Sequence, residues 1–378
     1  RRRHTRCSRD WSSDVCSSDL DDTACNLASL NLIKFYRDDS DQFDVESFRH
    51  ACRLWTIVLE ISVLMAQYPS RAIAQNSYDY RTLGLGYANL GALLMSMGLP
   101  YGSPKSLSMT AALTSILTGE AYATSAEMAQ YLGAFSKYKP NRESMLRVIR
   151  NHRRAAMGAK AKDYEGLSVT PTPIQWELIP TELQQASQKV WNEALNLGTE
   201  FGFRNAQVSV IAPTGTIGLI MDCDTTGIEP DFSLVKFKKL AGGGYFRIIN
   251  QSVPRALKNL GYGPKEVEAI VKYCVGHLSL KQSPVIHEES LRKKGFNAEQ
   301  LDRIEKAIES GFDLQYVITP YVIGEDFCRS QLGVKGTELD DPSFVLLTKM
   351  GFSPQEIEEA NRFVFGSMTI EGAPFLKD

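Results

Sequence analysis

The sequence lacks an uninterrupted run of about 18 apolar residues, the length that a membrane-spanning helix needs. It has only five histidines, no Cys-x-x-Cys pair, and no histidine spaced from a cysteine as a zinc site requires. Zinc sites in proteins are built from such closely spaced ligands. These absences argue against a membrane protein and against a metal site made by the chain itself.

The two signs of charge are nearly balanced. The sequence has 42 Lys and Arg and 44 Asp and Glu, which gives a formal net charge of -2 and a pI near 6.3. A protein that binds duplex nucleic acid needs a strong basic field. The balance argues against nucleic acid as a partner, whereas a nucleotide needs only a local site. With 378 residues, 43% of them hydrophobic, the chain can form one large α/β barrel or two ordinary domains.

The first twenty residues differ from the rest, because they have neither an apolar period nor the hydrophobic stretch of a signal peptide. Residues 10–20 read DWSSDVCSSDL, which is similar to the translation of a common sequencing adapter. Residues 1–20 are therefore expected to be a non-native, disordered segment in which Cys7 and Cys16 have no role. A native disordered tail is the alternative.

The remaining cysteines are odd in number and irregular in spacing, unlike those of a secreted disulfide scaffold. They are Cys25, Cys52, Cys223, Cys274 and Cys328. This usage favours a reducing cytoplasm, where an important cysteine is more often catalytic than structural.

A β-branched apolar run at residues 208–211 ends abruptly in the sequence APTGTIG at residues 212–218. The run predicts a strand, and the Pro, Gly and hydroxyl residues after it predict a tight loop. A loop of this kind points backbone N–H groups and hydroxyls at an anion, which indicates a phosphate-bearing ligand. An ordinary strand-to-helix turn is the alternative interpretation.

Apolar residues at helical spacing predict helices over residues 45–67, 108–132, 141–157 and 183–197. Residues 21–32 are expected to pass through the interior as a strand or loop.

Residues 81–100 contain Gly84, Gly86 and Gly91, but their spacing is not that of a dinucleotide-binding fingerprint, and no predicted strand precedes them. We interpret these glycines as small residues that let a helix pack closely against barrel strands.

Beyond residue 250 the chain changes character, because a glycine followed by an aromatic residue precedes three predicted helices. These pairs start at Gly261, Gly295 and Gly351. Ser353 and Glu356 fit a capping box, with Pro354 at the first helical position. The pattern predicts a helical subdomain over residues 251–366, inserted between a main domain at 21–250 and its continuation at 367–378.

Several segments occur here in the order found in the large, catalytic chain of ribonucleotide reductases, which this sequence resembles over residues 21–378. The shared segments are residues 24–32, 81–91, 203–205, 212–218 and 227–230. Residues 84–102 and 242–251 are most similar to the adenosylcobalamin-dependent branch. The resemblance implies an α/β fold, namely the C-terminal part of a ten-stranded α/β barrel with a helical insertion.

In this family a thiyl radical removes the ribose 3′ hydrogen, water leaves from C2′, and a cysteine pair supplies the reducing equivalents. The resemblance assigns Cys25 to one member of that pair. The alternative is a buried, inert cysteine, as is usual for a cysteine chosen at random. Its neighbours Asn26, Ser29 and Asn31 favour the redox role, and Asn26 and Asn205 are expected to support the site.

The resemblance also assigns the loop that follows the apolar run at residues 208–211 to the binding of the substrate phosphate. The residues of this phosphate loop are Pro213, Thr214, Gly215, Thr216 and Ile217. Glu229 is a candidate carboxylate that orients this loop, with a plain turn residue as the alternative. We interpret Cys223 as structural.

For the intact enzyme the resemblance implies adenosylcobalamin as cofactor, a ribonucleotide substrate, a nucleotide effector and a thioredoxin-like reductant. It places the radical-bearing cysteine, the partner thiol and the effector loops upstream of residue 21, so the chain alone is expected to be inactive. A diphosphate substrate is favoured over a triphosphate. The oligomeric state stays open, with a homodimer among the options.

Two other functions stay open. The first is the large subunit of the diiron, two-subunit reductases, which shares the barrel and differs in how the radical is generated. The second is a non-catalytic nucleotide-binding regulator that kept the phosphate loop, against which the presence of Cys25 argues.

Overall fold

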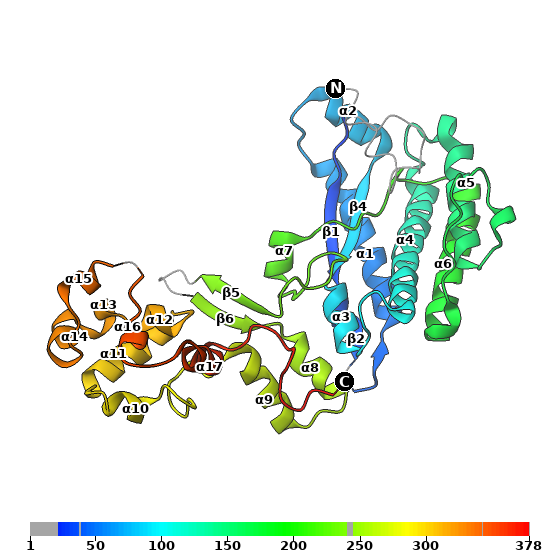
Figure 1. The fold of residues 1–378 in the computed structure, drawn as a ribbon. Coiled ribbons are helices and arrows are strands. Elements are labelled where there is room, and N and C mark those ends of the chain that lie inside the picture. The colour runs from blue at the N-terminus through cyan, green and yellow to red at the C-terminus, as the bar shows by residue number, and fades with distance from the viewer. Residues whose placement is uncertain (1–21, 38, 240–244, 342, 378) are drawn as a thin grey trace. The chain divides into compact units, whose positions relative to one another are not determined.

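The computed structural model describes residues 22–37, 39–239, 245–341 and 343–377. The chain divides into two compact units, Arg1–Asp231 and Phe232–Asp378, drawn in Figure 1. The division precedes the strands β5 (Val235–Lys239) and β6 (Tyr245–Ile249), whereas the sequence placed a domain limit at residue 250. The assignment of 21–250, 251–366 and 367–378 to domains stays a prediction, and the segment 1–20 lies outside the described residues.

The first unit combines a parallel strand pair with long helices. Its strands are β1 (Asn26–Asn31), β2 (Tyr36–Arg37), β3 (Gln42–Phe43) and β4 (Leu83–Ala88). Its helices are α1 (Val45–Met65), α2 (Arg71–Tyr80), α3 (Leu90–Ser96), α4 (Pro104–Leu132), α5 (Tyr138–Ala156), α6 (Thr181–Phe201) and α7 (Gly215–Ile220), with short 3-10 turns η1 (Leu32–Phe35), η2 (Ala161–Asp163) and η3 (Trp176–Leu178).

The predicted long helices are confirmed, and their starts have local causes. Asp44 caps α1 by accepting a hydrogen bond at 3.0 Å from the backbone N of Ser47. Ser103 caps α4, whose first residue is Pro104. A side-chain oxygen before the first turn satisfies an otherwise unpaired N–H, and proline at the first position loses nothing because its missing N–H has no partner there.

Strands β1 and β4 pair in parallel, with Ser29 opposite Gly86. The chain after α6 runs along the other edge of β4, where Leu85 and Ser209 form a parallel bridge and Val210 N donates to Leu85 O at 3.0 Å. The predicted strand before the loop is not a regular strand in the structure; residues 208–211 run as a third parallel segment that forms one isolated bridge to β4. The carboxyl ends of all three segments meet at one edge of the sheet.

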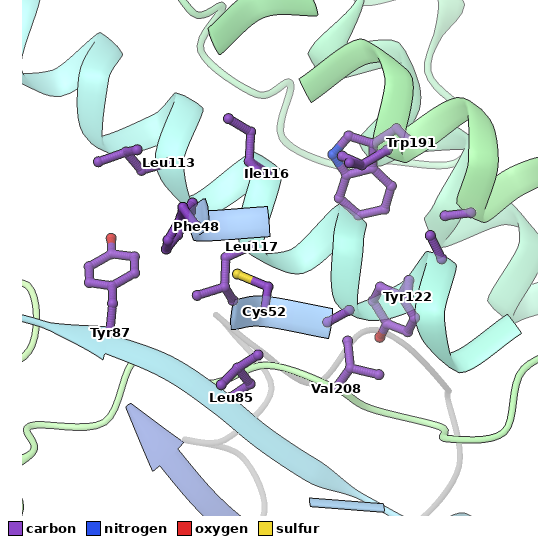
Figure 2. Packing of buried hydrophobic residues seen from close by; sticks show 14 of the residues in the cluster. Phe48, Cys52, Leu85, Tyr87, Leu113, Ile116, Leu117, Tyr122, Trp191 and Val208 are labelled. Atoms are coloured by element: carbon purple, nitrogen blue, oxygen red, sulfur yellow. The ribbon is translucent and has the colours of Figure 1, made fainter. Parts of the chain in front are cut away.

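One face of this sheet packs against the helices. Figure 2 shows the core between them, with labelled side chains from α1, α4, α6 and β4 and from the segment beside β4. Phe48, Cys52, Leu85 and Leu117 are each 0% exposed. Complete burial of such a side chain contributes roughly 1.5–3 kcal/mol, so this face is reserved for packing.

The prediction of a helix across residues 81–100 is wrong in its first half, because residues 83–88 form strand β4. The glycines in this strand make room for a neighbouring backbone segment and do not serve to pack a helix against strands. A Cβ added at Gly86 would overlap the carbonyl oxygen of Val210, because the backbone of the third segment lies directly against β4 at that point. Only the short helix α3 follows, beginning at Leu90.

We expect Gly86→Ala to lower the free energy of unfolding by about 2 kcal/mol, the usual cost of forcing a methyl group into a filled position. Gly215→Ala is the matched control, because a Cβ there would meet nothing within 4 Å. Urea unfolding of the two variants measures the difference. Equal free energies of unfolding in the two variants would show that the contact between Gly86 and the Val210 backbone leaves room for a methyl group.

The second unit is a helical subdomain that begins with an antiparallel hairpin. Its strands are β5 (Val235–Lys239) and β6 (Tyr245–Ile249). Its helices are α8 (Ser252–Asn259), α9 (Pro264–Val275), α10 (Glu288–Arg292), α11 (Ala298–Ile308), α12 (Leu314–Val317), α13 (Pro320–Ile323), α14 (Glu325–Gln331), α15 (Gly336–Leu339), α16 (Leu346–Lys349) and α17 (Pro354–Phe365).

The predicted cap of α17 is confirmed. Ser353 Oγ accepts from Glu356 N at 3.3 Å, and Glu356 Oε2 accepts from Ser353 N at 2.7 Å, with Pro354 as the first helical residue. Buried residues such as Ile304, Ile308 and Val364 form a core in this unit separate from that of the first.

The ten-stranded barrel is not seen in the part of the chain that the structure describes. The strands there form three two-stranded sheets, β1–β4, β2–β3 and β5–β6, and none of them closes on itself. What the first unit shows is a parallel, helix-covered fragment of α/β type.

Candidate functional site

The candidate site lies on the face of the β1–β4 pair turned away from the helical core. Successive side chains of a strand point to opposite faces, and Ala28 and Leu30 are buried in the core. Ser29 therefore faces the other way. Cys25 lies on this second face too, because a Cβ added at Gly84 would lie 2.8 Å from Cys25 Sγ. The thiol lies over the β4 backbone where glycine leaves room for it.

Both neighbours of Cys25 are held by side chains of other elements. Ala24 N donates to Ser77 Oγ at 3.0 Å, and Thr82 Oγ1 donates to Ala24 O at 2.8 Å. Asn26 Nδ2 donates to Ser62 Oγ at 2.7 Å. The predicted supporting role of Asn26 stays a prediction, and the contact shows that Asn26 ties the start of β1 to helix α1.

The thiol of Cys25 has little thiolate character. The residue as a whole is exposed, but partial burial of its thiol raises the pKa of Cys25 to about 11. At neutral pH the group is therefore a protonated thiol. That state suits a donor of hydrogen and is unsuited to a thiolate nucleophile.

Thr214 shapes the predicted phosphate loop. Its backbone is left-handed, with φ 51° and ψ 46°, which is rare for a β-branched residue, and it stands just before helix α7. Thr214 Oγ1 donates to Ala212 O at 3.0 Å and lies 2.8 Å from Ser29 Oγ. Because the single hydroxyl proton of Thr214 goes to Ala212, Ser29 is the donor to Thr214.

The other loop residues are open. Pro213, Gly215, Thr216 and Ile217 are exposed, whereas Thr214 is buried. The hydroxyl of Thr216 and the backbone N–H groups that begin α7 are therefore the groups that can meet an anion. The hydroxyl of Thr214 is already engaged within the protein.

Three residues that the sequence did not single out as a group hold the chain after the loop. Asn89 Nδ2 donates to Asn31 Oδ1 at 3.0 Å, and Asn89 Oδ1 accepts from Thr225 N at 3.1 Å. Asn31 Nδ2 in turn donates to Met221 O at 3.2 Å. Asn89 is 1% exposed and left-handed, with φ 71°. This clamp fixes the loop to the carboxyl ends of β1 and β4.

Glu229 lies at the rim of the loop. A Cβ added at Gly227 would be 2.7 Å from Glu229 Oε2 and 3.4 Å from Pro213 Cα. Tyr101 OH donates to Ile228 O at 2.8 Å. Partial burial, and secondly the charge of Glu229, raise the pKa of Tyr101. Glu229 is exposed and borders the loop, and its orienting role stays a prediction.

Asn205 lies in the interior, with every polar side-chain atom engaged. It is 0% exposed, its Oδ1 accepts from Ser125 Oγ at 2.8 Å, and its Nδ2 donates to Glu60 Oε2 at 2.6 Å and to Arg81 O at 2.9 Å. It contacts the start of β4, so any support it gives to a ligand site acts through the position of that strand.

Cys223 follows helix α7, and its backbone N donates to Gly218 O at 2.9 Å. Burial, and then the charges of Asp224 and Asp222, raise its pKa to about 11.

Within the described residues, no three His, Cys, Asp or Glu side chains group as a metal site would require. A search of the same ranges finds no helix with the length and hydropathy to cross a membrane.

Known proteins were compared with the whole chain. The family model "Ribonucleotide reductase, barrel domain" matches residues 10–308. The vitamin B12-dependent ribonucleotide reductase of Bradyrhizobium diazoefficiens is 56% identical over 359 residues, which are 95% of this chain and 28% of that protein. The enzyme of the same name from Agrobacterium fabrum is 55% identical over 360 residues, again 95% of this chain and 28% of the relative.

A more distant relative is the ribonucleoside-diphosphate reductase subunit alpha of Chlamydia pneumoniae, 26% identical over 261 residues, which are 69% of this chain and 23% of that protein. The chain thus spans little more than a quarter of the length of the relatives it resembles most among these three. Because the family model covers most of the chain, the chain belongs to the ribonucleotide reductase barrel-domain family.

Proposed function

We propose that the intact protein reduces ribonucleotides to 2′-deoxyribonucleotides for DNA synthesis, with Cys25 as one of its two reducing thiols. In the net reaction the C2′–O bond of the ribose is replaced by a C2′–H bond, and the oxygen leaves as water. Two thiols lose their hydrogens and form one S–S bond, which balances the two electrons taken up by the sugar. The second thiol is assigned to no residue of this chain.

One observation carries the proposal: the thiol of Cys25 and the loop at residues 213–217 belong to the same sheet face and are joined by β1. Ser29, which donates to Thr214 of the loop, lies four positions along from Cys25. At the rise of a strand this is roughly 13 Å. An extended nucleotide spans such a distance, with its phosphate at the loop and its sugar toward the thiol.

In this proposal Thr216 and the N–H groups that begin α7 bind the phosphate, while Ser29 and the Asn31, Asn89 and Thr225 clamp hold the loop in place. The protonated state of Cys25 matches its role, because a thiol must bring its hydrogen to the reaction. Asn26 and Asn205 position β1 and β4, and Glu229 borders the phosphate.

The relatives named vitamin B12-dependent support adenosylcobalamin as the cofactor, which would supply the radical that starts the reaction. The contacts to the cofactor are assigned to none of the described residues. The ten-stranded barrel, a nucleotide effector, a thioredoxin-like reductant, a homodimer and a cytoplasmic location belong to the proposal for the intact protein. A diphosphate substrate is part of it as well.

The diiron reductase is the second candidate for the intact protein. The identities favour the cobalamin branch, because the two relatives named vitamin B12-dependent are more than twice as identical to this chain as the Chlamydia subunit, whose name mentions no cobalamin. A non-catalytic regulator would have no need of a thiol on the face that carries the loop.

The test is reduction of CDP by the intact protein, with dithiothreitol as the reductant. We expect dCDP only when adenosylcobalamin is added, and none when iron and oxygen replace it. Assays with CTP decide between diphosphate and triphosphate. Reduction that needs no cobalamin would contradict the cofactor, and the absence of any deoxynucleotide would contradict the reductase function.

A further inference from the structure

Two of the three Gly-aromatic segments in the second unit begin a longer repeat. Residues 351–376 align without gaps with residues 261–286 when Gly351 is placed on Gly261. The identical pairs are Gly261 and Gly351, Pro264 and Pro354, Glu266 and Glu356, Glu268 and Glu358, Gly276 and Gly366, and Pro284 and Pro374. Helices α9 and α17 occupy equivalent positions in the two copies.

The structure pairs the two copies about a local two-fold axis. Each copy donates the same two backbone hydrogen bonds to the helix end of the other, as a two-fold relation requires. The first equivalent bonds are His277 N to Phe363 O at 3.0 Å and Ser367 N to Tyr273 O at 2.9 Å, and the second are Leu278 N to Val364 O at 2.9 Å and Met368 N to Cys274 O at 3.1 Å.

The helix ends touch at the two equivalent glycines. A Cβ added at Gly276 would lie 2.6 Å from Gly366 N, and one added at Gly366 would lie 2.5 Å from Gly276 N. Both glycines also have a left-handed backbone, with φ 82° and 75°. Only glycine combines the absence of a Cβ with a left-handed backbone, so both positions of this junction require glycine.

A cavity of about 530 Å³ opens at this junction. Equivalent residues of the two copies line it, among them Lys272 with Arg362, Tyr273 with Phe363, and Pro284 with Pro374. Its volume is in the range of small-molecule sites, which are typically lined by apolar and aromatic groups with a few charges. Neither the phosphate loop nor Cys25 belongs to this cavity.

The walls combine flat rings with positive charge. The rings of His277 and Phe363 are stacked, with centroids 3.9 Å apart and planes 3° from parallel. Within the described part of the chain, Lys272 and Arg362 pair only with exposed acids one helical turn away, Glu268 at 2.7 Å and Glu358 at 3.4 Å. Exposed pairs of this kind are weak, so both cations can turn to a bound anion.

We propose that this cavity binds a small anion carrying a planar aromatic ring. The ring packs against Tyr273 and Phe363, and the anionic group meets Lys272 and Arg362. Glu359 also lines the cavity, and its carboxylate can accept a hydrogen bond from a ring amine. Nucleotides and aromatic carboxylates share this chemistry. The proposal adds a second ligand site and is independent of the reductase function.

Hydrogen exchange of the full chain, read by mass spectrometry, tests the site. Four probes separate the two halves of the ligand: ATP and anthranilate carry both ring and anion, adenosine carries only the ring, and tripolyphosphate only the anion. We expect ATP or anthranilate to protect residues 265–277 and 359–363, and the one that does so identifies the source. Protection by adenosine or tripolyphosphate to the same degree, or by no probe, would overturn the proposal.

Replacing both cations, Lys272→Ala with Arg362→Ala, is expected to raise the Kd of the protective probe at least about tenfold. The matched control is Arg303→Ala with Lys306→Ala on α11, where the cations are also exposed and paired within one turn. Equal losses in both variants would also overturn the proposal. Protection of residues 212–220 reports separately on the phosphate loop, so failure at one site is distinguished from failure at the other.

Discussion

Replacing Cys25 with serine in the intact protein is expected to end multiple turnover while nucleotide binding is retained. Serine keeps the size and polarity of the side chain but cannot be oxidised to a disulfide, so the two electrons that the sugar needs are no longer available. The residue is exposed, and its neighbours are held through Ala24 and Asn26, so the fold should not change. The readout is deoxynucleotide formed per protein, measured beside the Kd for the substrate.

Cys223→Ser is the matched control for that experiment. Both cysteines are unpaired, partly accessible, and raised in pKa to about 11 by burial, but Cys223 follows α7 rather than preceding β1. We expect its turnover to stay within about a factor of two of the parent, since a solvent-accessible Cys-to-Ser change away from the reacting groups alters little. Undiminished turnover in Cys25→Ser, or equal loss in both variants, would remove the redox assignment.

Replacing Glu60 with alanine is expected to lower the free energy of unfolding by about 3–5 kcal/mol. Glu60 Oε1 lies 2.6 Å from Arg81 Nη2 and 2.7 Å from Arg204 Nε, and its other oxygen accepts from Asn205. The side chains of Arg81 and Glu60 are only 2% and 4% exposed. Removing the carboxylate leaves the guanidinium of Arg81 buried without its counter-charge.

The control is Glu127→Ala, which removes the partner of Arg53 from a pair whose two side chains are each 38% exposed. Water can replace that carboxylate, so the expected cost is only about 0.2–1 kcal/mol. Urea unfolding of both variants gives the two costs. Similar losses of unfolding free energy in the two variants would mean that burial of the Glu60 network adds nothing to its contribution. A changed slope of the unfolding free energy against urea concentration would signal a change in the unfolded or native state.

The helices were predictable because their information is local. The apolar period of α1 and α4 and the capping groups Asp44 and Ser353 act within one or two turns of the chain. Strand β4 was not predictable in the same way. Its sequence LGLGYA alternates glycine with large apolar residues. A helix-packing segment explains those glycines equally well, and only the structure shows that the backbone of Val210 lies against Gly86.

The candidate site divides along the same line. Cys25 and the loop at residues 213–217 could be named from motifs, because their chemistry is written in consecutive residues. Ser29 as donor to Thr214, and Asn89 as the clamp on Thr225, join residues far apart in sequence. Asn205 was expected to support the site; its complete burial could not be predicted from the sequence, and its supporting role stays a prediction.

The sequence by itself determined the family, the capped helices and the residues with reactive groups, because each depends on neighbours along the chain or on an ordered set of motifs. The tertiary structure alone decided on which face of the β1–β4 pair the thiol lies, which hydroxyl of the loop is already engaged, and that the repeats at Gly276 and Gly366 meet about a two-fold axis. These depend on packing between distant segments, where the close approach of one backbone to another determines what a side chain can reach.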